Sequence, residues 1–541
     1  MSRQKTPTLP RQGTVMERKT TPNRAATETI ADVLPGFDAE ESAHAEHLDQ
    51  RELENYLWGA ATLLRGLIDA GDYKQFVFPL LFFKRISDVH DEEREQAIAE
   101  YGEDDPETVA KEENYRFQIP DGAHWEDVRT ATADLGKALK TAMKLIESAN
   151  PDQLAGVFGD SQWTNKERLS DETLRNLLEH FSTQVLSLAR VPEDELGRAY
   201  EFLVKKFADD SGHTAQEFYT NRTLVRLMTR MLRPRPGESV YDPTCGTGGM
   251  LETAAAEIKD QGEDHRRLGL FGQELNVMTS SIARMNLYLH GIEDFKIERG
   301  DTLASPSFFE GDGLRRFDVI LANPPYSIKQ WNRDLFAKDP FKRNTWGVPP
   351  QGRADYAFIQ HIVTSLKPDT GRCAILLPHG VLFRADERAM RQKLIESDLL
   401  ECVLGLGPGL FYNSPMEACV VICRTQKPAE RQQKVLFIDA AHLIERTQGQ
   451  SFLSEEHISG ILAAYEDFME IPGFSTVASL ESLLSVDADL AISRHVKKNA
   501  TGETSDSEIP LPLAVSQWDR SMRDDMQVVK RIIAALRGDE T

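Results

Sequence analysis

Hydrophobic residues follow two different periods along this chain of 541 residues. Over residues 51–208 they recur at steps of three and four, which is the spacing that places side chains on one face of an α-helix. The first such stripe consists of Leu53, Tyr56, Leu57, Ala60, Leu63, Leu64 and Leu67. Further helices are expected over residues 135–147, 171–189 and 193–207. The pattern predicts an all-helical N-terminal domain over residues 51–208.

The pattern changes after residue 208. Short runs rich in β-branched residues alternate with helical segments, and strands are expected at 239–241, 268–271, 296–299, 317–321, 373–377, 401–404, 418–423 and 435–438. Strands that alternate with helices are typical of a mostly parallel, doubly wound sheet. The last strands are joined by segments too short for a crossover helix, so we expect an antiparallel hairpin at one edge. Residues 209–500 are therefore predicted to form an α/β domain of the Rossmann-like type.

Both ends of the chain differ from these two domains. Residues 1–50 are polar and carry too little apolar surface to offset chain entropy, so they are expected to be a disordered tail. Residues 501–541 are expected to form a linker and a C-terminal helix, whose apolar stripe is Trp518, Met522, Met526, Val529, Ile533 and Leu536. This helix either packs on its own domain or docks on a partner subunit.

The composition limits the class of protein. With 40% hydrophobic and 28% charged residues, the chain is ordinary for a globular protein. It has no run of about 18 apolar residues and no apolar segment behind its N-terminus, so we expect a cytoplasmic protein without a membrane anchor. The five cysteines are scattered, which predicts buried thiols rather than disulfides. We find no spacing of residues typical of a metal site.

A glycine-rich loop follows the first predicted strand of the α/β domain. It contains Asp242, Gly246, Thr247, Gly248 and Gly249. Glycines let the backbone approach a ligand without a clash at Cβ, and ligands of doubly wound folds lie beyond the carboxyl ends of the strands. The loop is therefore a candidate cofactor cradle.

Acidic residues also follow the second and third predicted strands, at Glu274 and Asp301. Three carboxylates at successive strand ends suit S-adenosylmethionine, because Asp242 can face its cationic end, Glu274 its ribose hydroxyls and Asp301 its adenine amino group. A phosphate-bearing nucleotide would instead call for a lysine or a Gly-Lys-Ser/Thr helix start. For each acid alone, the alternative is a helix N-cap or a solvated loop.

Residues upstream of the loop offer further cofactor contacts. Phe218 or Tyr219 could cover the cofactor, and Thr220 could cap a helix expected over residues 223–232. A core aromatic residue beside an N-cap explains the same segment equally well.

Asn323, Pro324, Pro325 and Tyr326 follow the strand expected at 317–321 and form the candidate catalytic group. The amino group of a base is a poor nucleophile because its lone pair is delocalised into the ring. The side-chain oxygen of Asn323 and the carbonyl of Pro324 can accept hydrogen bonds from both N–H groups, which frees that lone pair. The prolines stiffen the turn, and Tyr326 can stack on the base. The motif predicts methylation of an amino nitrogen, foremost adenine N6, in a base flipped out of DNA.

The segment after this motif is a candidate contact for nucleic acid. Residues 327–353 combine the cations Lys329, Arg333, Lys338, Lys342, Arg343 and Arg353 with the aromatic residues Trp331, Phe336, Phe341 and Trp346. A solvated insertion with a few core aromatics is the alternative. The net charge of the chain is −23, whereas a protein that binds DNA by itself usually has a basic face. Either the basic surface is local or another subunit makes most of the DNA contacts.

These motifs together resemble the modification (methylation) subunit of type I restriction-modification systems. The resemblance extends from about residue 52 to at least residue 495, and is carried by segments 57–61, 77–88, 217–220, 242–249, 323–326 and 489–494, and by Glu274. In place of the proline usual in that family, this chain has Asn221. The resemblance implies a methyltransferase fold behind a helical domain and N6 methylation of adenine in DNA.

The resemblance also implies roles for individual residues and for partners. The catalytic motif maps to Asn323, Pro324, Pro325 and Tyr326, and the cofactor contacts map to Gln216, Glu217, Phe218, Tyr219, Thr220, Asn221, Thr247, Gly248, Gly249 and Glu274. Members of the family work as two methylation subunits on one specificity subunit, which reads the DNA sequence, and a restriction subunit can join them. By analogy, the C-terminal helix would dock on the specificity subunit.

Other functions compete with this interpretation. A stand-alone DNA adenine methyltransferase would need a basic recognition domain, for which the chain leaves no room. A protein or RNA amino-methyltransferase would use the same motif on another substrate. A non-catalytic assembly subunit would not need the intact acids and the 323–326 motif.

Overall fold

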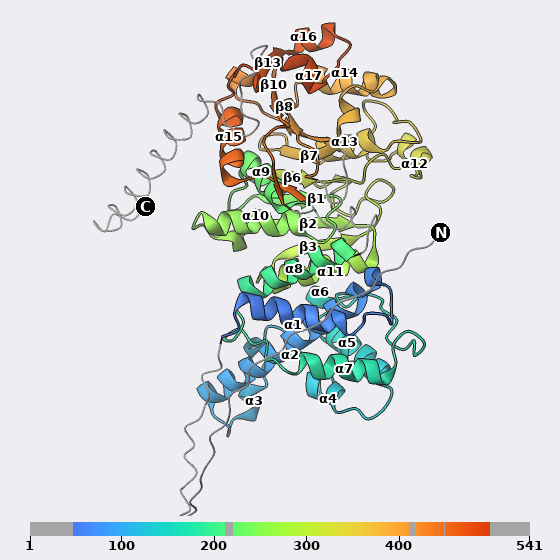
Figure 1. The fold of residues 1–541 in the computed structure, drawn as a ribbon, viewed down its shortest axis with the longest axis vertical. Helices are drawn as coiled ribbons and strands as arrows, with labels where there is room; N and C mark the ends of the chain where they lie inside the picture. Colours follow the sequence, from blue (N-terminus) through green and yellow to red (C-terminus); the bar gives the residue numbers. More distant parts are fainter. Residues whose placement is uncertain (1–46, 211–219, 411–416, 448–449, 498–541) are drawn as a thin grey trace, which may run out of the picture. The chain divides into compact units, whose positions relative to one another are not determined.

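The computed structural model of the protein describes residues 47–210, 220–410, 417–447 and 450–497. Residues 1–46 of the expected N-terminal tail and the expected C-terminal helix lie outside these residues, as do Gln216, Glu217, Phe218 and Tyr219. The last residues of the expected tail are ordered, because Asp49 caps a helix that begins at Gln50. Every part described before residue 211 is helical or loop (Figure 1). Its α-helices are α1 (Gln50–Thr62), α2 (Lys74–Tyr101), α3 (Pro106–Val109), α4 (Trp125–Arg129), α5 (Leu135–Ala149), α6 (Pro151–Leu154), α7 (Asp171–Phe181) and α8 (Glu193–Asp210).

Helix α1 buries only part of the apolar stripe that predicted it. Leu53, Leu57 and Ala60 are fully buried, but the helix ends at Thr62. Beyond that end the chain no longer follows the helical period, and Leu63 and Leu67 are 37% and 56% exposed. The expected stripe is therefore wrong in its last turn.

Helix α7 ends eight residues earlier than the predicted 171–189 segment, at Phe181. The buried Arg85 of α2 donates hydrogen bonds from Nη1 to the carbonyls of Leu186, Ser187 and Val191. The Ser187 carbonyl also accepts the Val191 N–H at 2.9 Å, as in one turn of a helix. The distant guanidinium thus ties the loop after α7 to α2.

A nine-stranded mixed sheet forms the second part. Its strands are β1 (Ser239–Asp242), β2 (Gly269–Glu274), β3 (Phe295–Arg299), β6 (Val319–Ala322), β7 (Arg372–Pro378), β8 (Leu400–Leu406), β9 (Ala418–Arg424), β10 (Lys434–Ala440) and β13 (Ser475–Ser479). All eight predicted strands are present within a few residues of their expected bounds. Two small hairpins, β4 (Phe309–Glu310) with β5 (Gly313–Leu314) and β11 (Glu445–Thr447) with β12 (Gln450–Phe452), stand apart from the sheet.

The strand order is β13-β10-β8-β9-β7-β6-β1-β2-β3. The expected antiparallel pair is confirmed, because β9 runs antiparallel to β8. Its expected place at the edge is wrong, since β9 lies in the interior between β7 and β8, and β10 and β13 extend the sheet beyond them. Complete burial of β8 and almost complete burial of β9 agree with an interior position, where both strand edges and both faces are covered.

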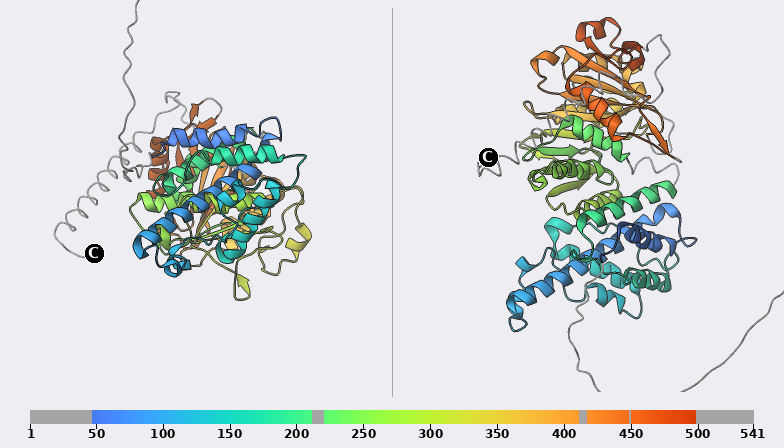
Figure 2. Two further views of the ribbon diagram at one scale, coloured as in Figure 1. Left: turned by 90° about the horizontal axis from the view of Figure 1, so that it is seen from below. Right: turned by 60° about the vertical axis from the view of Figure 1, so that its left-hand side comes forward.

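Alternate residues of the central strands enter two separate hydrophobic clusters, one on each face of the sheet. Val240, Val319 and Ala374 pack with α9 (Arg222–Leu232), α10 (Gly249–Asp260) and α15 (Glu455–Glu466). Tyr241, Ile320 and Ile375 pack with α13 (Asp355–Thr364), α14 (Arg388–Glu396) and α16 (Leu480–Ser485). Figure 1 shows α9, α10 and α15 to the left of the strands and α13 and α14 to their right, and the right-hand view of Figure 2 brings the left-hand side forward. Two covered faces are what a doubly wound sheet requires.

Helix α11 (Val277–Leu289) connects the sheet with the helical part. Ala283 and Leu287 belong to the cluster on the sheet, whereas Ile282 and Met285 belong to the cluster of the helical part. The hydroxyl of Tyr200 in α8 donates to the carbonyl of Ile282 at 3.1 Å. The helical part is thus packed directly against the helix that follows β2.

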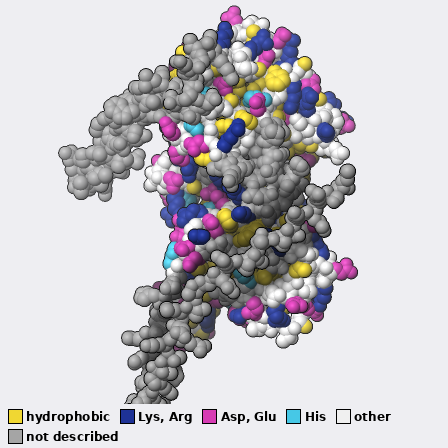
Figure 3. Space-filling model, viewed as in Figure 1, with side chains coloured by type: hydrophobic (Ala, Val, Ile, Leu, Met, Phe, Trp, Pro, Cys, Tyr) yellow, Lys and Arg dark blue, Asp and Glu magenta, His cyan; other side chains and the backbone are white. Residues whose placement is uncertain are grey.

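Surface and thiol features agree with the expectations from composition. All five cysteines are buried and none is in a disulfide. Acidic and basic side chains are interspersed on the face in Figure 3 rather than segregated by sign. Among the described helices, none is both long and apolar enough to cross a membrane.

Candidate active site

The predicted site residues converge at one edge of the sheet. Asp242 ends β1, Glu274 ends β2 and Asn323 follows β6 directly. Because β6, β1, β2 and β3 are neighbouring parallel strands, their carboxyl ends lie at the same edge. Asp301, two residues beyond β3, joins them there. This is the position at which doubly wound folds bind their ligands.

The glycine loop connects β1 with α10 and lies along the end of β2. Gly246 and Gly248 have φ angles of 53° and 80°, a left-handed conformation that glycine adopts without strain. The backbone N–H of Cys245 donates to the carbonyl of Gln273 at 3.0 Å. A Cβ on Gly272 would lie 2.9 Å from the Cys245 sulfur, so this glycine also permits the close approach. The loop thus forms an open turn of backbone beside β2.

Asp242 is a buried carboxyl group at the base of this loop. It is 2% exposed, and its Oδ1 accepts a hydrogen bond from the Thr244 N–H at 3.0 Å. Burial raises the pKa of Asp242 from its ordinary value of 3.8 to about 7, and the nearby Glu274 adds to that rise. No lysine or arginine pairs with Asp242 among the described residues. A cationic ligand bound beside Asp242 would therefore stabilise the charged form of this carboxyl group.

Glu274 and Asp301 hold the backbone of the site together. Glu274 accepts from the N–H groups of Gly246, at 3.1 Å, and Asn276, at 2.9 Å. Asp301 accepts from the N–H groups of Leu303 and Ala304. The alternative role that the sequence left open for these acids, capping of local turns, is therefore present in the structure. Both bonds to Asp301 end at Oδ1, so its Oδ2 accepts no hydrogen bond within the described residues.

Asn221, rather than Thr220, caps the helix that begins the α/β part. Its side chain accepts from the Thr223 N–H at 3.0 Å and donates to the Ser451 carbonyl at 2.9 Å. The expectation that Thr220 caps this helix is therefore wrong. With φ at −55°, Asn221 has the conformation that a proline would have at this position.

Thr220 instead contacts the candidate catalytic motif at residues 323–326. Its Oγ1 accepts a hydrogen bond from Asn323 Nδ2 at 3.0 Å, across 103 residues of sequence. Within the described residues, neither Asn323 Oδ1 nor the Pro324 carbonyl accepts a hydrogen bond. The Asn323 amide is thus held through its Nδ2. The two oxygens expected to bind an amino group, Asn323 Oδ1 and the Pro324 carbonyl, have no hydrogen-bond partner among the described residues.

The turn after Pro325 is fixed by buried charges that the sequence did not reveal. Ser327, with φ at 49°, donates its N–H to Asp355 Oδ1 at 2.9 Å. Asp355 is 1% exposed and pairs with Arg384 at 2.8 Å. Arg384 also pairs with the fully buried Glu387 at 3.5 Å. Asp355 and Arg384 lie 28 and 57 residues beyond Ser327, so no local pattern connects them with the motif.

Tyr326 lies between the motif and the core. Its side chain is half-buried and packs against the hydrophobic cluster of α9, α10 and the sheet. Burial raises the pKa of its hydroxyl well above the ordinary value, so the ring is neutral at any physiological pH. A ring held in this way can offer one face to a base without a charge change.

Comparison with known proteins assigns this arrangement to a family. A family model described as N-6 DNA Methylase matches residues 191–504, which is more than half of the chain. The chain belongs to the N-6 DNA methylase family. A second model, described as HsdM N-terminal domain, matches residues 53–181 of this methylase.

The relatives of this N-6 DNA methylase are methylation subunits of type I restriction enzymes. The MjaVIII methylase subunit of Methanocaldococcus jannaschii is 31% identical over 83% of this chain and 79% of its own length. The MjaIX subunit of the same organism is 26% identical over 87% and 88%. The crystal structure of the type I restriction-modification methyltransferase subunit from Streptococcus thermophilus is 30% identical with a TM-score of 0.72, and covers 83% of this chain and 100% of that chain. The expected family and fold are confirmed, and the chain is a DNA methyltransferase of this class.

The basic segment 327–353 of the methylase contains two kinds of cationic side chain. One kind is buried and stabilises the fold, and the other is exposed. Arg343 is 1% exposed, pairs with Asp339 and donates to the carbonyls of Thr302 and Leu303. It locks the loop to the segment after Asp301, so its expected role as a nucleic-acid contact is wrong. Lys329, Lys338 and Lys342 are exposed, and no ion pair involves them among the described residues.

Two groups of potential metal ligands are formed by the fold rather than by local spacing. They are His90, Asp91 and His124 in the helical part, and Glu201, Glu252 and His290 near α10. The second group already has a counter-charge, because Arg222 pairs with both Glu201 and Glu252. Arg222 also donates to the carbonyl of Gly249 at 2.5 Å and so ties α9 to the glycine loop.

Proposed function

We propose that this chain transfers a methyl group from S-adenosylmethionine to N6 of an adenine flipped out of DNA. In this proposal it acts in the cytoplasm as the methylation subunit of a type I restriction-modification complex. The observation that carries the proposal is the orientation of Asn323, whose Nδ2 is occupied by Thr220 while Oδ1 and the Pro324 carbonyl have no partner among the described residues. Two acceptors on consecutive residues match the two N–H groups of an exocyclic amine.

The residues around the glycine loop fit the cofactor. Gly246 and Gly248 turn the backbone away from the site, and a buried Asp242 without a cationic partner suits the positive end of S-adenosylmethionine. Glu274 and Asp301 would accept from its ribose and adenine. When bound there, the cofactor supplies an activated methyl group. Residues Gln216, Glu217, Phe218 and Tyr219 are proposed to complete this site together with Thr220, Asn221, Thr247 and Gly249.

Asn323 and Pro324 perform the positioning step. By accepting hydrogen bonds from both N–H groups they favour a pyramidal nitrogen, whose lone pair is then free to attack. Pro324 and Pro325 restrict the backbone of this turn, and the Asp355–Arg384 pair holds Ser327 beyond it. The acceptors are therefore placed before the base arrives, which saves the cost of ordering them during reaction.

The charge of the chain favours shared DNA binding. Flipping a base costs a few kcal/mol, which contacts to the rest of the duplex must offset. This chain offers exposed Lys329, Lys338 and Lys342 next to the site but has a net charge of −23. We therefore propose that a specificity subunit, bound by two copies of this chain, selects the sequence and makes most DNA contacts, and that a restriction subunit can join.

The test is a methylation assay with and without the specificity subunit, followed by sequencing of the DNA for N6-methyladenine. Methyladenine at one motif, formed only with the partner and lost in Asn323→Ala, is the expected result. Asn114→Ala in the helical part, where the amide donates to the Thr108 carbonyl, is the matched control and should retain activity.

Three results would contradict the proposal. Methylation without the partner would favour a stand-alone DNA methyltransferase. Methyl transfer to protein or RNA alone would assign another substrate. An unchanged rate in Asn323→Ala would remove the motif from the mechanism.

A further inference from the structure

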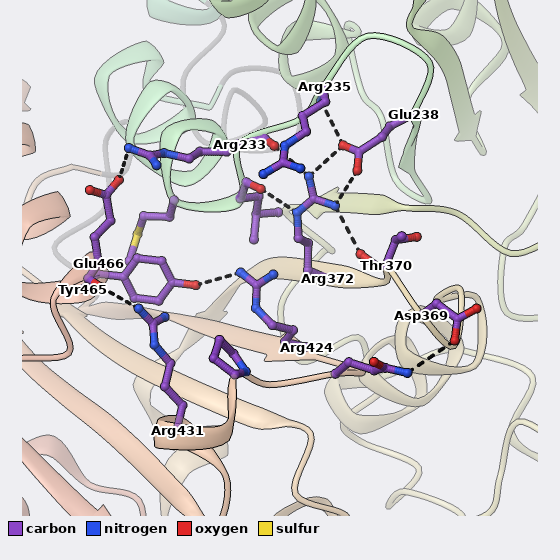
Figure 4. A pocket seen from close by; sticks show the side chains of 14 residues that line it. Arg233, Arg235, Glu238, Asp369, Thr370, Arg372, Arg424, Arg431, Tyr465 and Glu466 are labelled. Carbon is purple, nitrogen blue, oxygen red and sulfur yellow. Dashed lines mark hydrogen bonds and ion pairs between the residues drawn. The ribbon is translucent and has the colours of Figure 1, made fainter. Parts of the chain in front are cut away.

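A second site lies at the opposite edge of the same sheet. A cavity of about 380 Å³ opens where β1, β7 and β10 begin and β9 ends (Figure 4). Asp242 and Asn323 follow the carboxyl ends of β1 and β6, so the length of a strand separates them from this cavity. Its volume falls within the range of sites for small molecules. It shares no residue with the candidate active site.

Five arginines line this cavity, although the chain as a whole is strongly acidic. They are Arg233, Arg235, Arg372, Arg424 and Arg431. They face the lining carboxylates Glu238, Asp369 and Glu466 and the fully buried Glu401 behind the wall. Five guanidinium groups against four carboxylates leave one net positive charge, on a chain whose net charge is −23.

Arg372 lines the cavity, but other residues of the protein hold its guanidinium in place. Its guanidinium makes a bidentate pair with Glu238, at 2.7 and 3.1 Å, and donates to the carbonyls of Leu232 and Arg233. Because these partners occupy its donors, Arg372 fixes the start of β7 to the segment before β1. It is not available to a ligand.

Arg424 and Arg431 share a single counter-charge. Arg424 donates from Nε to Glu401, and Arg431 donates from Nη1 to the same carboxylate at 3.1 Å. Within the described residues Arg424 Nη1 makes no hydrogen bond. Arg431 also donates from Nη2 to the Glu466 carbonyl at 2.5 Å, so its remaining donor is Nε, which is buried without a partner among the same residues. A buried donor without a partner costs about 1–3 kcal/mol, so a ligand acceptor there would be favourable.

Arg235 adds a third available cation at the mouth of the cavity. Its side chain is exposed and makes no hydrogen bond or ion pair with any described residue, while its backbone N–H donates to Glu238 at 2.8 Å and its carbonyl accepts from the Glu238 N–H at 3.0 Å. Arg233 beside it is paired with Glu466 at 2.6 Å. Arg235 precedes β1, whereas Arg424 and Arg431 both lie in the segment from the end of β9 to the residues before β10, so these donors come from two parts of the chain.

The remaining wall is apolar and aromatic. Met231, Leu232 and Pro428 line the cavity together with the ring of Tyr465, which lies 5.5 Å from the Arg431 guanidinium. Figure 4 shows the Tyr465 hydroxyl directed at Arg424, at 3.4 Å. A ligand that carries an anionic group beside a flat apolar group would contact both the arginines and the apolar wall of this cavity.

We propose that this cavity binds a small phosphate-bearing molecule. A phosphate group has three acceptor oxygens, which matches donors on three arginines better than the two oxygens of a carboxylate. The proposal is independent of methyl transfer, because no residue of the cavity belongs to the catalytic motif or the glycine loop.

Isothermal titration calorimetry at constant ionic strength tests this proposal. Inorganic phosphate, pyrophosphate, AMP and ATP are titrated into the full chain saturated with S-adenosylhomocysteine, so that the candidate active site is occupied. At least one of them is expected to bind. Stronger binding of AMP than of phosphate identifies a nucleotide that uses the apolar wall, and equal binding identifies the phosphate group alone as the ligand.

Matched variants locate the binding. Arg235→Ala combined with Arg424→Gln should weaken binding at least tenfold, while Arg431 still neutralises Glu401. Arg198→Ala, which removes an equally exposed arginine paired with Asp194 on α8, should leave it unchanged. Circular dichroism confirms that the variants fold, and Arg235→Ala alone, at an exposed position, should still weaken binding.

Two outcomes would overturn the proposal. Either none of the four probes binds at millimolar concentration, or they bind with equal affinity to the double variant. If the double variant instead loses affinity for duplex DNA alone, the cavity is part of the DNA contact and not a small-molecule site.

Discussion

The Nδ2 of Asn323 donates a hydrogen bond to the Oγ1 of Thr220 at 3.0 Å. This contact joins two motifs that the sequence separates by 103 residues. In this contact Oδ1 points away from Thr220. We propose that the hydroxyl positions the Asn323 amide for the reaction.

Thr220→Val should lower kcat for methylation about 10- to 100-fold, because the amide loses the partner that fixes its orientation. Thr220→Ser keeps the hydroxyl and should retain most of the activity. The melting temperature should change little in either variant, and Thr220→Ser should also keep its affinity for S-adenosylhomocysteine. Equal loss of activity in both, or loss of folding, would contradict a positioning role.

Asp242→Asn should stabilise the protein in the absence of cofactor. Burial raises the pKa of Asp242 to about 7, so the folded state holds its proton more tightly than the unfolded chain does. This contribution is fully present below the ordinary pKa of 3.8 and is lost as the pH rises to about 7. The variant, which stays neutral, should thus melt a few degrees higher than the parent at pH 8, with a smaller difference at pH 5.

The same substitution should abolish cofactor binding, since asparagine offers no charge to a cationic ligand. For the parent protein, affinity for S-adenosylmethionine should increase with pH as Asp242 ionises. Calorimetric titration between pH 6 and 8 measures this. A pH-independent affinity would exclude contact between Asp242 and the positive end of the cofactor.

Arg384→Gln should destabilise the turn behind the catalytic motif. It would leave Asp355 and Glu387, both almost fully buried, without the cation that they share. Removing one partner of a buried pair costs about 3–5 kcal/mol. Chemical denaturation measures the loss, and Arg388→Gln, at an exposed ion pair on the neighbouring helix, should change stability by less than about 1 kcal/mol.

Replacement of Lys329, Lys338 and Lys342 by alanine should weaken DNA binding without affecting stability, because all three are exposed. If each contacts one phosphate, the slope of log affinity against log salt should fall by about 1 for each lysine. Arg343→Ala should instead lower stability and leave the slope of log affinity against log salt unchanged, since it leaves the buried Asp339 unpaired. DNA titrations of the assembled complex at several salt concentrations distinguish the two.

The amino-acid sequence by itself determined the local elements and the chemistry at their ends. The periods of apolar residues placed four of the helices before residue 208, apart from the ends of α1 and α7, and all eight predicted strands, because burial of one face or of both faces leaves a regular signature. The acids at 242, 274 and 301 and the motif at 323–326 could be assigned to one edge, because parallel neighbouring strands must end together.

Only the tertiary structure decided which distant segments meet. Pairing of β9 between β7 and β8, the contact of Thr220 with Asn323, and the loop held by Arg85 depend on partners far along the chain. The same holds for Arg343, which looked like a surface cation and is buried by a fold-specific pair with Asp339. The arginine-lined cavity is assembled from four segments, none of which carries a motif. A local pattern indicates whether a side chain is buried, but only the packing of the whole chain determines which residues it contacts.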